Sequence, residues 1–336
     1  MYASNDESDT LLVAEQWLRE GRQTALATVI ETWGSAPRRI GSQMIIDAQG
    51  VFLGSVSGGC VETEVITAAA DVIATGEPKL LEFGVADETA WRVGLSCGGR
   101  IRVSVECPDK ELLYRLNQER SARRTALVIS DLNQGHQRLI RENDDVEDDL
   151  RDEATTALRN GVSRILEVGE KTYFLNVFRP KPRLVIIGAV HISQALAPMA
   201  HMVGYDVEII DPRTAFASPE RFPASRIYPD WPQDILTKRP LDRHTALAAL
   251  THDPRIDDWA LAAALEAGCF YVGALGSRKT HAQRLQRLAA LGTKQPDLDR
   301  IAAPIGLNIG AATPSEIAVA VLAEIIRSFR FPKAEA

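Results

Sequence analysis

The sequence predicts an α/β protein with two parts: a smaller α+β N-terminal domain, then a C-terminal doubly wound parallel sheet. After residue 181, continuous apolar segments alternate with helical patterns, which is typical of parallel strands covered on both faces. In the first hundred residues, apolar segments flank turn sequences, as around Asp47-Ala48-Gln49-Gly50, which indicates antiparallel hairpins. The chain has 336 residues, enough for two domains.

We expect the first domain to span residues 1–108. A helix follows Asp9 and ends at Gly21, and residues 24–30 form a strand. Residues 61–75 have helical spacing and stop at Gly76. Residues 100–106 form a strand with alternate apolar side chains on one face.

Residues 109–180 are expected to form a bridging α+β segment with an acidic insertion. A proline-containing linker at 179–182 then leads into the third segment, residues 181–336. There we expect strands at 184–187, 207–210, 245–250 and 270–274, with helices between them and at 314–329. This order predicts a Rossmann-like sheet.

Composition restricts the function classes. The formal net charge is −7, which argues against nucleic acid as a partner because phosphate backbones attract basic surfaces. The acidic N-terminus does not resemble a signal peptide, and no apolar run is long enough for a membrane span. Four cysteines without a C-x-x-C pair predict a reducing, cytoplasmic environment rather than a disulfide framework.

Two glycine-flanked cysteines, Cys60 and Cys97, are the candidate catalytic residues. Glycine removes side-chain cover, so a ligand can approach the sulfur and the neighbouring N–H groups. Cys60 precedes a predicted helix, whose N-terminal N–H groups and dipole favour a thiolate or a bound oxyanion. The alternative for each is a small packing residue or a loop residue without a role. No further ligands at useful spacing accompany them, so we predict no metal site, and Cys107 and Cys269 are expected to pack internally.

The turn Gly188-Ala189-Val190-His191 occupies the position of a dinucleotide-binding loop, with Asp211 at the end of the next strand. Val190 replaces the glycine that lets a pyrophosphate approach the backbone, which counts against ordinary NAD(P) binding. His252 and Asp253 follow another strand, at the sheet edge where ligands bind in such folds. The segment 273–279, which contains Arg278, is a second candidate anion site.

Taken together, these motifs resemble the XdhC/CoxI family of xanthine dehydrogenase accessory proteins over nearly the whole chain. The segments that carry the resemblance are Gly34-Ser35-Ala36-Pro37-Arg38, Gly54 to Glu62, Cys97-Gly98-Gly99, Asp211-Pro212-Arg213, Thr251-His252-Asp253, Leu275-Gly276-Ser277-Arg278, Pro304 to Leu307 and Pro314 to Ala318. The family usually has Gly-Ala-Gly-His where this chain has Val190. The candidate cofactor-binding residues are Arg38, Ser57, Gly58, Gly59, Glu62, Gly98, Gly99, Gly188, His191, Asp211, Arg213, His252, Asp253, Ser277 and Arg278.

The resemblance implies a cytoplasmic, homodimeric maturation factor that binds the molybdenum cofactor, as molybdopterin or its dinucleotide form. It implies that the cofactor is kept while a cysteine desulfurase helps to install its sulfur, and is then delivered to a xanthine or carbon monoxide dehydrogenase. Such a protein is an accessory factor rather than an enzyme. Thiolates suit the metal's sulfur-rich surroundings, which agrees with Cys60 and Cys97. The alternatives are an NAD(P)-binding oxidoreductase and a scaffold that binds no cofactor.

Overall fold

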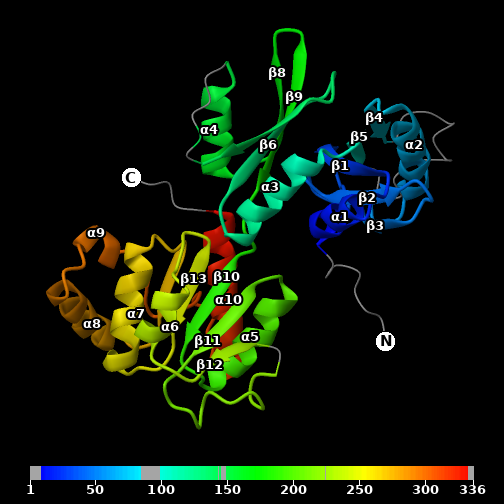
Figure 1. Cartoon of the computed structure of the whole chain (residues 1–336). Coiled ribbons are helices and arrows are strands. Elements are labelled where there is room, and N and C mark those ends of the chain that lie inside the picture. The colour runs from blue at the N-terminus through cyan, green and yellow to red at the C-terminus, as the bar shows by residue number, and fades with distance from the viewer. Residues whose placement is uncertain (1–8, 85–98, 143, 145–148, 224, 332–336) are drawn as a thin grey trace. The chain divides into compact units, whose positions relative to one another are not determined.

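The computed structural model of the protein describes residues 9–84, 99–142, 144, 149–223 and 225–331. It divides into two compact units, Met1–Pro180 and Lys181–Ala336 (Figure 1). The first is built on antiparallel sheets and the second on a parallel sheet, which confirms the predicted fold class. The division of the first unit at residue 108 stays a prediction.

The first unit contains a five-stranded antiparallel sheet with the order β3-β2-β1-β5-β4. Its strands are β1 (Thr24–Trp33), β2 (Gln43–Asp47), β3 (Phe52–Gly54), β4 (Lys79–Phe83) and β5 (Arg100–Glu106). Alternate side chains of β1 and β5, among them Val29 and Val103, pack against helix α2 (Glu62–Thr75) on one face. The opposite face carries α1 (Thr10–Arg19) and α3 (Lys110–Ser121), which contact each other. The hairpin predicted at 47–50 joins β2 to β3 as expected.

The remainder of this unit is a second antiparallel sheet, ordered β7-β6-β9-β8. Its elements are β6 (Ala126–Asp131), β7 (Gln137–Arg141), α4 (Arg151–Asn160), β8 (Arg164–Val168) and β9 (Lys171–Phe178). Leu116 of α3 and Val128 of β6 belong to the same buried cluster as Leu26 of β1. The two sheets therefore share a core.

The second unit has six parallel strands in the order β12-β11-β10-β13-β14-β15. They are β10 (Arg183–Ile187), β11 (Asp206–Ile210), β12 (Arg226–Tyr228), β13 (Thr245–Ala249), β14 (Tyr271–Ala274) and β15 (Ile301–Ala302). The strand order reverses between β10 and β13, so the crevice used by ligands in such sheets lies at their carboxyl ends.

Helices cover both faces of this sheet (Figure 1). One face packs against α5 (His191–Met202) and α10 (Pro314–Arg330). The other packs against α6 (Pro232–Lys238), α7 (Pro254–Glu266), α8 (Arg278–Ala290) and α9 (Gln295–Leu298). Burial on both faces explains why strands such as β10 are apolar throughout.

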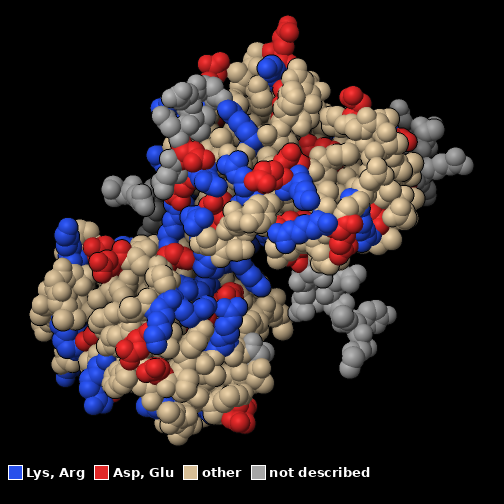
Figure 2. Space-filling model, in the orientation of Figure 1, with Lys and Arg blue, Asp and Glu red and all other residues tan. Residues whose placement is uncertain are grey.

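Basic and acidic side chains are interspersed over each unit on the face drawn in Figure 2. Within the described ranges, no helix has both the length and the apolar character to cross a membrane.

Candidate functional site

Loops from three parts of the first unit meet at one edge of its five-stranded sheet. Trp33, the last residue of β1, pairs with Arg100, the first of β5. A Cβ atom placed on Gly99 would lie 2.3 Å from the carbonyl oxygen of Ser35, and one on Gly58 would lie 3.8 Å from the Cβ of Pro37. The loop after β1 therefore contacts both the loop after β3 and the chain entering β5. Because no side chain fits at Gly99, glycine is required there for this contact.

This edge gathers the first-unit motifs that the sequence singled out. Gly58, Gly59 and Cys60 are exposed, whereas Ser57 and Glu62 are buried. Arg38 is half-buried in the neighbouring loop. Cys97 and Gly98 lie outside the described residues, and Gly99 is the first described residue after them.

The carboxylate of Glu62 organises the loop that carries Cys60. Its Oε1 accepts hydrogen bonds from Ser55 Oγ at 2.7 Å, Ser57 N at 2.9 Å and Val56 N at 3.3 Å. Its Oε2 accepts from Ser57 Oγ at 2.5 Å, Gly59 N at 2.9 Å and Val61 N at 3.2 Å. Burial opposes ionisation, but the hydrogen bonds from Ser55 and Ser57 prevail and lower the pKa of Glu62 to about 2.

This network changes the expected chemistry of the loop. The N–H groups of Ser57, Gly59 and Val61 already have an anionic acceptor inside the protein, and the N–H of Cys60 donates to Ser57 Oγ at 2.9 Å. These loop amides therefore have acceptors inside the protein, and the binding of an oxyanion at the start of α2 stays a prediction. The feature that the loop presents to a ligand is the exposed Cys60 side chain.

The first unit also has an open hollow of about 180 Å³. It is lined by Arg39, the residues that follow it up to Ser42, and Ser163 and Asn176 of the second sheet region. Arg39, two residues after Pro37 in the loop that follows β1, thus lies at a concave surface.

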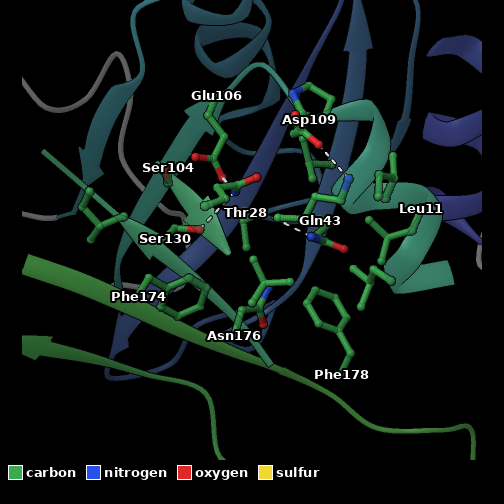
Figure 3. A pocket seen from close by; sticks show the side chains of 18 residues that line it. Leu11, Thr28, Gln43, Ser104, Glu106, Asp109, Ser130, Phe174, Asn176 and Phe178 are labelled. Carbon is green, nitrogen blue, oxygen red and sulfur yellow. Dashed lines mark hydrogen bonds between the residues drawn. The ribbon is translucent and has the colours of Figure 1, made fainter. Parts of the chain in front are cut away.

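A second, smaller cavity of about 30 Å³ lies between the two sheets (Figure 3). The polar side chains that line it include Thr28, Gln43 and Glu106, and Gln137 Nε2 donates to Glu106 at 2.6 Å. Burial raises the pKa of Glu106 to about 7. The cavity has room for about one or two water molecules, so it is an internal polar pocket rather than a cofactor site.

In the second unit, Asp211 accepts a hydrogen bond from the turn at residues 188–191, which has the position of a dinucleotide-binding loop. Asp211 is fully buried, and its Oδ2 accepts from Ala189 N at 2.8 Å and from Arg213 Nη2 at 2.7 Å. Burial opposes this charge, but the hydrogen bonds from Arg213 and Ala189 lower the pKa of Asp211. Gly188 is buried against Thr251, whereas His191, the first residue of α5, is exposed. Asp211 thus holds Ala189 and Arg213 in place, and its part in binding a cofactor stays a prediction.

His252 is held in a left-handed backbone conformation, φ 64°, immediately beyond β13. Its N–H donates to Asp257 Oδ2 at 3.1 Å, and Thr251 Oγ1 donates to Asp257 Oδ1 at 2.7 Å. The side chain of His252 is exposed, while Asp253 is half-buried and caps α7. A strained residue beside a ligand crevice is typical of functional sites.

Ser277 and Arg278 are exposed at the start of α8, as a ligand-binding position requires. The sequence interpretation overlooked Arg284, two turns further along, which is 2% exposed. Arg284 lies four residues before the buried Leu288, so a charge on the buried stripe of α8 is the signal that could have identified it. No group of three or more acidic, His or Cys side chains suited to a metal occurs in the described part of the chain.

A Rossmann-type parallel sheet joined to a separate antiparallel unit with an exposed cysteine loop defines a two-unit α/β protein. More specifically, the chain belongs to the XdhC and CoxI family: residues 17–84 match the XdhC and CoxI family and residues 184–325 match the XdhC Rossmann domain. This confirms the resemblance stated from the sequence.

Named relatives cover almost the full length. The molybdenum cofactor insertion chaperone PaoD of Escherichia coli K12 is 31% identical over 96% of this chain and 89% of its own. A probable xanthine dehydrogenase subunit of Bacillus subtilis 168 is 29% identical, covering 93% and 94% of the two chains. A crystal structure described as a xanthine dehydrogenase from Bacillus halodurans is similar with a TM-score of 0.71, 25% identity and 97% coverage of both chains.

Proposed function

We propose that this protein is a maturation factor that binds the molybdenum cofactor and delivers it to a xanthine dehydrogenase or carbon monoxide dehydrogenase type of enzyme. The observation that carries the proposal is the convergence of the loop after β1, the Cys60 loop and Gly99 at one sheet edge. The relative from Escherichia coli, described as an insertion chaperone for this cofactor, supports the same role.

Each part of that edge has a distinct task in the proposal. Cys60 presents an exposed thiol to the metal or to its sulfur ligands. Arg38 and Arg39 supply guanidinium groups for the phosphate of the pterin, in molybdopterin or in its dinucleotide form. Glu62 does not touch the cofactor: it holds the loop through Ser55 and Ser57, so it is a positioning residue. Cys97 and Gly98 are proposed as further contacts on the strength of the family resemblance.

The wider role follows from this binding. A cofactor held at an exposed thiol is open to a cysteine desulfurase, which would assist installation of the terminal sulfur, and then to the target enzyme. We propose that the protein acts in the cytoplasm as a homodimer and as an accessory factor rather than as an enzyme.

Mixing the full chain with isolated molybdenum cofactor tests the proposal, with bound metal and pterin fluorescence measured after gel filtration. Cys60→Ala is expected to lower the retained cofactor at least tenfold. Cys107→Ala is the matched control, because Cys107 is also exposed but lies beyond β5, with its Sγ 3.6 Å from the carbonyl oxygen of Val72. Equal retention by the parent and Cys60→Ala would show that Cys60 is not an essential contact. No retention by any variant would favour the scaffold without cofactor.

The NAD(P)-dependent oxidoreductase remains the alternative that the Rossmann-type sheet suggests. Two observations oppose it: Val190 stands at the pyrophosphate approach, and Asp211 is committed to Ala189 and Arg213. Titration of the protein with NADH, followed by nicotinamide fluorescence, is expected to show no saturable binding.

A further inference from the structure

Arg284 is a buried cation whose hydrogen-bonding capacity is largely unused. It is 2% exposed, and its Nη2 donates to the carbonyl oxygen of Leu275 at 2.8 Å. Within the described residues, its Nε and Nη1 have no hydrogen-bond partner. Buried guanidinium nitrogens without an acceptor are costly, so Nε and Nη1 call for a functional explanation.

The guanidinium points back to the N-terminus of its own helix. Its Nη2 lies 3.6 Å from the position of a Cβ on Gly276, in the turn that leads from β14 into α8. Ser277 caps this helix by accepting from Thr280 N. The first N–H groups of α8 and the helix dipole therefore add their positive potential to that of Arg284.

Two histidines border the same place. His281 lies one helical turn before Arg284, and its buried Nδ1 has no partner among the described residues. Burial, together with the charge of Arg284, lowers the pKa of His281 and of His252. Both imidazoles are therefore neutral at pH 7, and each can donate one hydrogen bond to an anion.

The nearby carboxylates do not use up the free donors of Arg284. Asp257 attracts Arg284 at a distance, but its oxygens accept from Thr251 Oγ1 and from His252 N. Asp258 is bound by Arg287, whose Nε lies 2.5 Å and Nη2 3.0 Å from its oxygens. An acceptor for Nε and Nη1 must therefore come from elsewhere.

We propose that the N-terminus of α8, with Arg284, His281 and His252, binds a phosphate monoester. A tetrahedral dianion offers several oxygens, which match the planar fork of an arginine and the N–H groups of a helix start. The unused nitrogens of Arg284 are screened from solvent, so the adjacent turn must shift to admit the phosphate. Gly276, at φ 141°, has the conformational freedom for this movement.

The direct test measures phosphate binding to the full chain, without molybdenum cofactor. Inorganic phosphate is titrated at constant ionic strength, with chloride as the replacement anion, and the amide hydrogen exchange of residues 275–284 is followed. Saturable protection of this segment is expected. Its absence up to 50 mM phosphate (roughly the weakest affinity of interest for a single anion) would overturn the proposal without involving any variant.

Variants then assign the effect to Arg284. Arg284→Met is expected to weaken phosphate binding at least tenfold, and Arg284→Lys to have an intermediate effect because it keeps the charge but loses the fork. The matched control is Arg255→Gln, which removes an equal charge from a side chain that is 81% exposed and paired with Asp253 on the neighbouring helix α7. Parent-like binding by Arg284→Met, or an equal loss in Arg255→Gln, would refute a specific site.

The same chemistry can come from a pterin phosphate, a nucleotide or free phosphate, and competition distinguishes these sources. Displacement of inorganic phosphate by adenosine 5′-monophosphate or by the isolated molybdenum cofactor identifies the corresponding source. Binding of inorganic phosphate alone identifies the free anion, and each of these results retains the site. Because Cys60 takes no part, this site and the proposed maturation function fail or succeed separately.

Discussion

Replacing Glu62 with glutamine tests how the Cys60 loop is held. The carboxylate accepts from four backbone N–H groups and from the hydroxyl groups of Ser55 and Ser57. A glutamine side chain has one oxygen and one NH₂ group. The NH₂ group would therefore point at N–H or hydroxyl donors that now bind a carboxylate oxygen, and it cannot accept from them. We therefore expect the loop from Ser55 to Val61 to lose its single conformation in Glu62→Gln.

The lowered pKa of Glu62 gives the free energy by which the hydrogen bonds stabilise its ionised form. Its fall from the ordinary 4.5 to about 2 corresponds to about 3 kcal/mol of stabilisation of the ionised form in the folded state. Since the folded pKa is depressed, this contribution is present above pH 4.5 and is lost as the pH falls towards 2. The parent and Glu62→Gln should thus differ most at neutral pH and converge near pH 2.

Amide hydrogen exchange is the suitable assay, because the chain has two units and global unfolding mixes them. A loss of about 3 kcal/mol in local opening free energy predicts exchange about 100-fold faster at Ser57, Gly59 and Val61 in Glu62→Gln at pH 7. Glu77→Gln is the control: Glu77 is exposed just after α2, and the charge change is the same. Unchanged exchange in Glu62→Gln would refute the assigned role of the carboxylate.

Two further perturbations address the interior and the sheet edge. Burial raises the pKa of Glu106 from 4.5 to about 7, so the stability contributed by the neutral carboxyl is lost as the pH rises through this range. The opening free energy of the β5 amides, measured by hydrogen exchange at pH 8, should be about 3 kcal/mol higher in Glu106→Gln than in the parent. A difference that does not grow between pH 5 and pH 8 would contradict this. At His252, where φ is 64°, a left-handed backbone strains any residue with a Cβ, so the opening free energy of the β13 amides, measured by hydrogen exchange, should be about 1 kcal/mol higher in His252→Gly than in His252→Ala. Equal exchange rates in the two variants would argue against strain there.

The sequence could predict the architecture because periodicity reports burial directly. The alternation of Ile101, Val103 and Val105 placed them on one face of a strand, and they pack there against α2. Cys269 is buried as expected, but the expectation for Cys107 was wrong: it lies one residue past the end of β5 and is exposed. Burial at strand ends depends on how neighbouring elements cover them, and a pattern along one strand does not contain that information.

The sequence also could not predict which acceptors the backbone N–H groups of these loops find. A glycine-rich segment before a helix predicts free N–H groups and hence a ligand anion. Which acceptor they find depends on the rotamer of a single side chain, here that of Glu62. In the same way, a charge at Arg284 is ordinary for a helix until the fold shows that it faces inward.

The loops that the sequence analysis identified share one feature: a carboxylate of the protein accepts a hydrogen bond from a loop N–H group. Glu62 accepts from the N–H groups of the Cys60 loop, Asp211 from Ala189 N, Asp257 from His252 N, and Glu324 from Gly306 N at 2.8 Å. In each case a carboxylate accepts from a loop N–H group, so these acidic residues help to fix the conformation of their loops. Cys60 and His252 are exposed on these loops. Arg284 differs from this pattern because its neighbouring carboxylates are committed elsewhere, and for that reason we assign it an external anion.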